Sequence, residues 1–363
     1  MDKTTERALA SELIDLNAQK SAYLKPKVSH ADVRHYTDEA RFNRELAAIF
    51  RRVPQVVAHS SQLPGEGAFM RCDIAGLPVL LTRDSSFTVH AFLNVCRHRG
   101  MRLVTDSSGC KRRFSCPYHA WTYSNQGELL AVPHEQQGFP DLDKSSLGLT
   151  RLSCHERHGW VWVSPVVGDT ESLLPKVEVL GQEFDAIGMA DHQIVHTDER
   201  IGRANWKIFV EGGLEAYHFR VAHRDTIGPY FLDNLSSYQR IGPNLRSILA
   251  RKTLTTIDDV DKDAFRLRDH AQILYSVFPT TQLLVQDDHF AWIQIEPISV
   301  DSTRIRIHTL APAARVRDAD DLAHWARNHA ITVDTLTEDF EIGEGIQEGL
   351  SSGANAALMF GRF

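Results

Sequence analysis

The chain has 363 residues, 42% of them hydrophobic and 24% charged, a composition that is typical of globular proteins and excludes a disordered or collagen-like chain. No apolar run approaches the ~20 residues of a membrane-spanning helix, and the N-terminus lacks the apolar core of a secretory signal. Because 47 Asp and Glu outnumber 40 Lys and Arg and no basic block is present, we expect a cytoplasmic protein that binds neither nucleic acid nor membranes.

The first half of the chain predicts helices followed by short strands. Apolar residues at three- and four-residue spacings predict helical structure over 8–16 and 38–50. From about Val53 the pattern changes to short β-like runs separated by turn sequences; these runs cover residues 78–82, 87–92 and 159–163. They predict a small antiparallel β domain that ends near Pro165.

The second half predicts long strands and a long helix. After a linker-like stretch over 166–180, residues 282–296 and 303–310 predict paired strands. Residues 318–350 predict one or two long helices, introduced by capping Asp residues. The fold class is therefore α+β, with a β domain followed by a domain of sheet and helix.

Two short sequences each pair a cysteine with a histidine, Cys96 with His98 and Cys116 with His119. Two thiolates and two imidazoles suit either a zinc ion or a Rieske [2Fe–2S] centre, in which two His replace two Cys on one iron. Zinc knuckles usually pair Cys with Cys and His with His, whereas here each loop offers one of each. That interleaving favours the diiron cluster over a zinc ion. It also favours a cluster over the alternative, in which the cysteines are ordinary buried residues and the histidines are unrelated members of the chain's 18.

The residues around these four fit the same interpretation. Gly100 and Pro117 supply tight turns that let backbone N–H groups approach the cluster sulfides. The other cysteines, Cys72, Cys110 and Cys154, have no partner at a ligand spacing, and we expect them to be small buried hydrophobes. Five cysteines in so long a chain indicate metal or redox chemistry rather than a disulfide scaffold.

A second group of candidate ligands lies at 215–223. Glu215 and His218 are three residues apart and are expected to share a helix face. His218 and His223 are five apart, so they converge on one metal only if the helix is distorted or ends between them. Two imidazoles with open coordination positions suit a site for Fe(II) with two His and one carboxylate. The alternative is a pair of structural imidazoles.

The third ligand of such a site is sought on the C-terminal helix. At about 100° per residue, one inward stripe holds the apolar or small side chains of this helix and also Asp339; the other members of that stripe are Leu336, Phe340, Gly343, Ile346, Gln347 and Leu350. Four glutamates, Glu338, Glu341, Glu344 and Glu348, fall outside it, on the side expected to face solvent. A buried carboxylate needs a partner, for which a metal is one candidate and a local hydrogen bond the alternative. If Asp339 is not the ligand, Glu338 and Asp334 are the next candidates.

Together these residues resemble the Rieske non-heme iron oxygenases, the catalytic (alpha) subunits of ring-hydroxylating systems. Cys96 to Gly100 and Cys116 to Trp121 resemble the cluster motif of that family. Asn205-Trp206-Lys207, Glu215-x-x-His218 and His223 resemble its mononuclear iron motif, and Glu338-Asp339 its third-ligand site. The resemblance covers most of the chain.

The resemblance implies an architecture, cofactors and an activity. It implies an N-terminal helical segment (1–45) packed on the catalytic domain, a Rieske domain (46–165), and a helix-grip catalytic domain (166–363), an antiparallel sheet wrapped on a long helix. One [2Fe–2S] cluster would be held by the four Cys and His ligands of the first site; one mononuclear Fe(II) would be held by His218, His223 and Asp339, with O2 as co-substrate. The implied function is mono- or cis-dihydroxylation of an aromatic or other small organic substrate. The alternative is O- or N-demethylation of a methylated or quaternary ammonium compound.

The same resemblance implies partners. No nicotinamide or flavin fingerprint is present, so electrons must come from a reductase or ferredoxin, with NAD(P)H used only indirectly. Glu215 would be a bridging carboxylate between His218 and His119 of a neighbouring subunit, in a homotrimer or other ring of alpha subunits. One departure is Gly212, where the family often has Asn. The alternative for Glu215 is a solvated side chain paired with an arginine, Arg220 or Arg224.

Two rival functions remain from the residues alone. A Rieske electron carrier would leave the region after Val166 unused, and a carrier of hydrophobic ligands would use His218 and His223 only as polar pocket residues. Substrate selectivity would depend on pocket residues, for which the sequence suggests Phe209, Leu214, Leu284, Val285 and Phe290.

Overall fold

The computed structural model describes residues 1–169, 171, 173–257 and 264–362. They divide into two compact units. The β unit is Leu46–Asp185, and the helix-grip unit joins Met1–Glu45 to Ala186–Phe363. The first boundary falls at the end of the predicted N-terminal segment, whereas the second falls later than the predicted residue 165.

The later boundary has a packing reason. The stretch read as a linker contains α5 (Leu173–Glu178), which lies against β10 and β11 of the β unit and buries Leu173 and Val177. The next helix, α6 (Gly181–Ala186), places Phe184 edge-on to Trp160 at 6.1 Å between ring centroids. These helices therefore belong to the core of the β unit.

The β unit contains a seven-stranded and a three-stranded antiparallel sheet. The larger has the order β2-β11-β10-β5-β4-β3-β6, and the smaller the order β7-β8-β9. β4, β5 and β11 overlap the three predicted strands. The bounds are β2 (Gln55–His59), β3 (Ala68–Ile74), β4 (Leu77–Arg83), β5 (Val89–Leu93), β6 (Ser108–Cys110), β7 (Arg113–Ser115), β8 (Thr122–Ser124), β9 (Leu129–Ala131), β10 (Arg151–Arg157) and β11 (Trp160–Val167).

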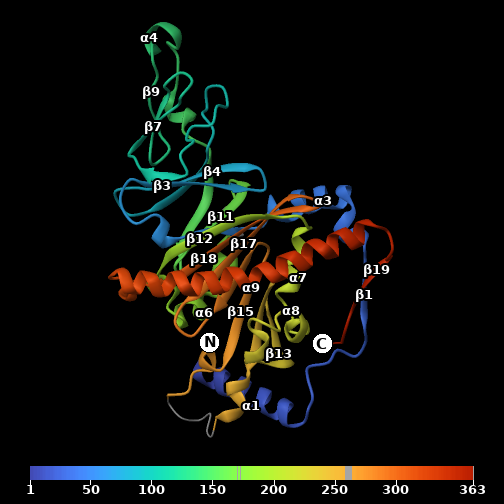
Figure 1. The fold of residues 1–363 in the computed structure, drawn as a ribbon. Coiled ribbons are helices and arrows are strands. Elements are labelled where there is room, and N and C mark those ends of the chain that lie inside the picture. The colour runs from blue at the N-terminus through green and yellow to red at the C-terminus, as the bar shows by residue number, and fades with distance from the viewer. Residues whose placement is uncertain (170, 172, 258–263, 363) are drawn as a thin grey trace. The chain divides into compact units, whose positions relative to one another are not determined.

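The helix-grip unit contains a second seven-stranded antiparallel sheet and one long helix. The strand order is β12-β18-β17-β16-β15-β14-β13. The helix α9 (Ala319–Ser351) begins at Asp318, whose side chain accepts from the Asp321 N–H, and lies along β12 and β18 (Figure 1). The predicted α+β class with a helix-grip sheet is confirmed. The strand bounds are β12 (His192–Gly202), β13 (Phe231–Ile241), β14 (Asn244–Arg251), β15 (Ala271–Val277), β16 (Thr281–Val285), β17 (Phe290–Ser299) and β18 (Ser302–Pro312).

The prediction of a single strand over residues 282–296 was wrong. Residues 282–296 form two strands, β16 and β17, joined by a tight turn that the Gln286 N–H closes by donating to the His289 carbonyl. The turn carries Asp287 and Asp288, which are poor strand residues. In this hairpin Leu284 of β16 lies opposite Ala291 of β17, so the side chains of these two residues lie on the same face of the sheet.

The N-terminal residues complete the helix-grip unit. The helix α1 (Lys3–Ala18) buries Ala10 and Leu13 and contacts β13. The short helix α2 (Arg34–Thr37) contacts α9. The predicted helix over 38–50 is split into α3 (Glu39–Glu45) and a π-helical turn, and β1 (Ser29–Asp32) pairs with β19 (Ala357–Phe360). Within the described part of the chain, no helix is both long and apolar enough to cross a membrane.

Candidate metal centres

The histidines of the second predicted site flank a single helical turn. The helix α7 (Trp206–Gly212) begins at Asn205, whose side chain accepts from the Lys207 N–H. It ends at a glycine pair, and at Gly213 a side chain is excluded because a Cβ would lie 2.8 Å from the Gln282 side chain. The chain then leaves helical structure until α8 (Phe219–Ala222), which is preceded by His218 and followed by His223.

This local geometry corrects one expectation and explains another. Glu215 lies outside any helix, so the prediction that it shares a helix face with His218 was wrong. The two histidines converge, with ring centroids 5.1 Å apart, because α8 ends at His223. Two histidines five residues apart were expected to converge only if the helix is distorted or ends between them, and here the helix ends.

Asp339, from the middle of α9, completes a compact group with these histidines. Its Oδ1 lies 3.3 Å from Nε2 of His218 and 2.9 Å from Nε2 of His223. One ligand atom from each residue lies within 4.8 Å of the others, and no other group of three or more such side chains is this compact in the described residues. Two imidazoles and a carboxylate on one side of an open position fit the donor set preferred by non-heme Fe(II).

The charges of this group are mutually dependent. Burial lowers the pKa of His218, but its hydrogen bonds with Asp339 and Glu215 outweigh that effect and raise the pKa to about 9. Burial raises the pKa of Asp339, but the two imidazoles outweigh it, and the net pKa is lowered. Without a metal, protons therefore bind between these side chains. A cation must displace them, so we expect metal affinity to fall as pH falls.

The outer nitrogen of each imidazole is held by a glutamate. Nδ1 of His218 lies 2.6 Å from Glu215, and Nδ1 of His223 lies 2.6 Å from Glu338. Glu338 also accepts from the hydroxyl of Thr226 at 2.7 Å. Such contacts fix the ring orientation and leave Nε2 free for a metal.

The role of Glu338 corrects the solvent-facing assignment made from the helical stripe. Glu338 is half-buried because the chain around His223 and Thr226 covers that face of α9. Glu344 is likewise paired, with Arg203 at 2.9 Å, whereas Glu341 and Glu348 are exposed as predicted. Within the inward stripe, Ile346 was wrongly placed, since it is 41% exposed.

Glu338 makes a test of the site that does not depend on activity. We expect Glu338→Ala to free the His223 ring and weaken Fe(II) binding by about 10- to 100-fold. Glu338→Gln retains an acceptor oxygen for the ring N–H and should bind iron nearly as well as the wild type. Equilibrium dialysis against Fe(II) without O2 measures this, with the exposed Glu341→Ala as control. Undiminished iron binding by Glu338→Ala would show that this contact does not position His223.

Glu215 is not paired with either of the two arginines that the alternative proposed. Arg220 lies near Asp233 and Arg224 near Asp225. Besides His218, the Glu215 carboxylate accepts from the Tyr217 N–H and is 37% exposed. It is thus fixed on one side and open to solvent on the other.

The first predicted site, in the β unit, consists of two loops with the same backbone pattern. The Cys96 N–H donates to the Met101 carbonyl, and the Gly100 N–H donates back to the Cys96 carbonyl. The Cys116 loop repeats both bonds, with Trp121 and Ala120 in the corresponding positions. Gly100 and Ala120 both have positive φ, +74° and +56°. The turn of the second loop thus depends on Ala120, whereas the sequence suggested Pro117.

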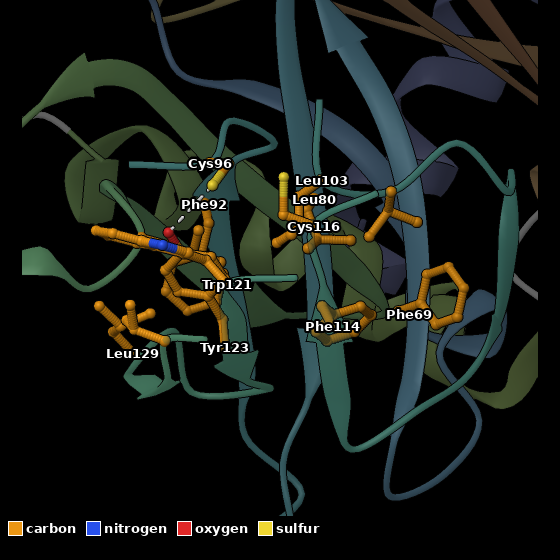
Figure 2. Packing of buried hydrophobic residues seen from close by; sticks show 13 residues of the cluster. Phe69, Leu80, Phe92, Cys96, Leu103, Phe114, Cys116, Trp121, Tyr123 and Leu129 are labelled. Atoms are coloured by element: carbon orange, nitrogen blue, oxygen red, sulfur yellow. Dashed lines mark hydrogen bonds between the residues drawn. The ribbon is translucent and has the colours of Figure 1, made fainter. Parts of the chain in front are cut away.

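The two loops place the thiols inside and the imidazoles outside. Cys96 and Cys116 are 2% and 4% exposed, and Figure 2 shows both sulfur atoms on the same side of their hydrophobic cluster. His98 and His119 lie nearer the surface, with ring centroids 4.7 Å apart. The Tyr123 hydroxyl lies 3.4 Å from the Cys96 sulfur (Figure 2).

These four residues fit a cluster better than a single ion. They do not form one of the compact groups found among the described residues, so they are spread more widely than one zinc ion requires. Buried thiols on one side and imidazoles toward the surface match the two unlike ends of a Rieske centre. Of the other cysteines, Cys72 and Cys154 are partly buried; the expectation was wrong for Cys110, which is exposed.

Two adjoining cavities meet at the His218–Asp339 group. One has a volume of about 110 Å³ and the other about 150 Å³, and both are lined by His218, Asp339 and Gln282. Of the suggested pocket residues, Leu284 lines the first and Phe209 the second, whereas Leu214, Val285 and Phe290 line neither. The apolar lining of the first consists of Phe219, Ile227, Leu249, Leu274, Leu284, Ile293, Ile331 and Leu336.

Three glutamines in this lining were not anticipated from the sequence. Gln272, Gln282 and Gln286 all line the first cavity. The sequence holds only a weak indication that these glutamines line a cavity, because polar residues at alternate strand positions usually indicate the solvent face of a sheet. Here that face is covered by α9 and the metal-binding segment.

Comparisons with known proteins agree with the two units. Residues 189–363 match the family described as ring hydroxylating alpha subunit (catalytic domain), and residues 53–162 match the Rieske [2Fe-2S] domain.

Among individual relatives, the chain is similar to the glycine betaine monooxygenase oxygenase subunit of Chromohalobacter salexigens, with 30% identity over 60% of this chain and 48% of the relative. It is also similar to the biphenyl 2,3-dioxygenase subunit alpha of Rhodococcus jostii, with 40% identity over 34% of this chain and 26% of the relative. The chain thus spans about half or less of the length of these curated relatives.

A solved structure shares the fold. It is a quaternary ammonium Rieske monooxygenase described in connection with carnitine oxidation by gut microbiota and inter-subunit electron transfer. The TM-score is 0.77 at 22% identity, covering 93% of this chain and 89% of that chain.

Proposed function

The chain belongs to the Rieske non-heme iron oxygenase family of catalytic alpha subunits, and on that premise we propose that it is the terminal oxygenase component of a multicomponent system. In the dihydroxylating form of the reaction, one O2, two electrons and two protons convert an aromatic double bond into a cis-diol. In the hydroxylating form, one oxygen atom enters a C–H bond and the other leaves as water.

The observation that carries this proposal is the position of the Asp339 carboxylate between two imidazoles at the wall of an apolar cavity. When bound there, Fe(II) would supply O2 activation, and a [2Fe–2S] cluster on the β unit would supply single electrons. Glu215 and Glu338 would hold the imidazoles in orientation. The leucine and isoleucine side chains of the cavity would exclude water and position the substrate.

The cavity supports a neutral substrate over the quaternary ammonium alternative. A quaternary ammonium ion calls for an aromatic cage or an unpaired carboxylate, and the first cavity offers one aromatic ring, Phe219, and one carboxylate, the proposed ligand Asp339. Among the described residues no Lys or Arg lines it, so away from the metal ligands it offers no cationic side chain to an anionic substrate. A cavity of ~150 Å³ accommodates benzene, so the two adjoining cavities, of about 110 and 150 Å³, together have room for a small aromatic compound.

The proposed partners follow from the chemistry. Electrons from NAD(P)H would arrive through a separate reductase or ferredoxin, since the chain carries no nucleotide-binding fingerprint. We further propose that the alpha subunits form a homotrimer or other ring, in which Glu215 faces His119 of the adjacent subunit.

Counting iron separates the proposed function from its rivals. The purified protein should be brown and hold about three irons per chain, whereas an electron carrier would hold about two and a ligand carrier none. His98→Ala or Cys116→Ala should bleach the cluster absorption, while Cys110→Ala, at an exposed cysteine, should not. A colourless wild-type protein that contains zinc would refute the Rieske centre and, with it, the oxygenase function.

A further inference from the structure

The first cavity has an ordered sequence of polar and apolar side chains along its sheet wall. Gln282 and Leu284 of β16, and Gln286 directly after the end of β16, line the cavity at alternate positions, as alternate residues of an extended chain do. Gln282 marks the metal end, since it packs against Gly213 in the segment that precedes His218. Gln286 is about 13 Å further along at ~3.3 Å per residue.

The neighbouring strand repeats this order. Leu274 of β15 pairs with Leu284 of β16, and Gln272, two residues before Leu274, lies on the same face of the sheet. Both Leu274 and Gln272 line the cavity. The cavity therefore has an apolar middle formed by leucines and, far from the metal ligands, an end that carries two amides.

Gln272 presents its side-chain amide to the cavity. The residue is 9% exposed. Among the described residues no hydrogen bond to its side-chain amide is formed, and the polar atoms of that amide are accessible rather than enclosed. An accessible amide that faces a cavity can be hydrated while the cavity is empty. An apolar ligand that displaces this water leaves the amide unpaired, whereas a ligand with a hydrogen-bond acceptor pairs it.

Gln286 adds a donor of defined direction. Its side-chain oxygen accepts from the Arg251 guanidinium at 3.0 Å, and a guanidinium can only donate. The amide NH2 of Gln286 is therefore the group left for a ligand. Arg251 itself is paired with Asp287 at 2.6 Å and does not line the cavity, so this end of the cavity stays uncharged.

We propose that Gln272 and Gln286 bind an uncharged hydrogen-bond acceptor, such as a ketone, ether or nitro oxygen, on an otherwise apolar substrate. The leucines would hold the hydrocarbon part, and the opposite end of the molecule would face His218, His223 and Asp339. This inference rests on the proposed function, because it takes the cavity as the substrate site. It narrows the substrate class from neutral aromatic compounds to those with one polar oxygen remote from the oxidised carbons.

The test compares ligands that differ only in the acceptor. Binding of indane and 1-indanone, and of ethylbenzene and acetophenone, is measured by calorimetry on the iron-loaded protein without O2. We expect each ketone to bind about five- to tenfold more tightly than its hydrocarbon. In Gln272→Leu the preference should shrink to less than about twofold, because a leucine of similar volume offers no donor. The matched control is Gln193→Leu, a glutamine of β12 that does not line the cavity.

A stability measurement on the same variants separates ligand binding from a structural role. Because the Gln272 amide has no partner in the folded chain, Gln272→Leu should keep or raise the melting temperature. A fall of several degrees would show that the amide supports the fold, and would overturn the inference. Equal binding of ketones and hydrocarbons by the wild type, or failure of every ketone to bind, would overturn it as well.

The outcome is independent of turnover. The ketone preference needs neither O2 nor a reductase, and iron is counted in the same samples. Protein with full iron content and no ketone preference would reject this inference alone. Protein that cannot be loaded with iron at the mononuclear site would reject the proposed function, while the ketone preference would still decide the role of Gln272.

Discussion

Asp339→Ala is expected to abolish oxygenation and to remove the mononuclear iron while leaving the cluster spectrum unchanged. The carboxylate lies between two imidazoles, 3.3 and 2.9 Å from their Nε2 atoms, and is the one acidic group in contact with both. Without it, two neutral nitrogens remain to hold a divalent cation. The loss of iron affinity should exceed the ~10- to 100-fold change that is typical when a residue that only hydrogen-bonds a metal ligand is replaced. The two sites belong to different units, so the visible absorption of the cluster should survive.

The measurement is iron content, visible absorption and product formation on the same preparation. His218→Ala and His223→Ala should behave in the same way as Asp339→Ala. The exposed Asp334→Asn, on the same helix, is the matched control and should retain iron and activity. If Asp339→Ala kept both, Glu338, which contacts His223 at Nδ1, would become the candidate carboxylate ligand.

Glu215→Gln is expected to retain both metal centres and the fold, yet to reduce turnover by about 10- to 100-fold. The glutamine can still accept the hydrogen bond from Nδ1 of His218. Its NH2 group, however, is only a donor, whereas both carboxylate oxygens accept. A second imidazole N–H, such as that of His119 on an adjacent subunit, would lose its acceptor. The half-exposed position of Glu215 leaves room for such a contact.

The kinetic readout is the rate at which a pre-reduced cluster reoxidises in a single turnover. In Glu215→Gln this rate should fall, while iron content and the cluster spectrum stay at wild-type values. Near-normal turnover by this variant would exclude the bridge. Glu341→Gln, an exposed glutamate of α9, serves as control.

Mixing the impaired Glu215→Gln variant with the cluster-deficient His119→Ala variant tests whether the bridge crosses between subunits. In a mixed ring, a His119→Ala chain retains Glu215 and can meet an intact His119 on a Glu215→Gln neighbour. A crossing between subunits therefore predicts partial recovery of activity. A bridge confined to one chain predicts none, because neither variant carries both residues.

The sequence determined those parts of the protein that depend on neighbouring residues. The cluster loops could be found because each contributes its ligands from four or fewer consecutive residues, and such short loops keep their geometry wherever they are placed. Asp339 could be found because an α-helix turns by about 100° per residue, so the residues that share its buried face can be identified from the order of residues alone. The periodicity of the chain predicted its strands and its long helix, whereas the helix-grip class was predicted from the resemblance of the ligand motifs to the Rieske oxygenases.

Only the tertiary structure decided what surrounds each element. Glu338 lies outside the inward stripe of α9, yet it is half-buried, because the His223 segment, which is distant in sequence, covers it. The register that pairs Leu274 with Leu284, and so brings two neighbouring strands to one wall of the cavity, depends on pairing between strands. A cavity is likewise formed by side chains from a sheet, a helix and a loop at once. Periodicity along one segment reports which side chains face inward, but it does not report which other segment they meet there.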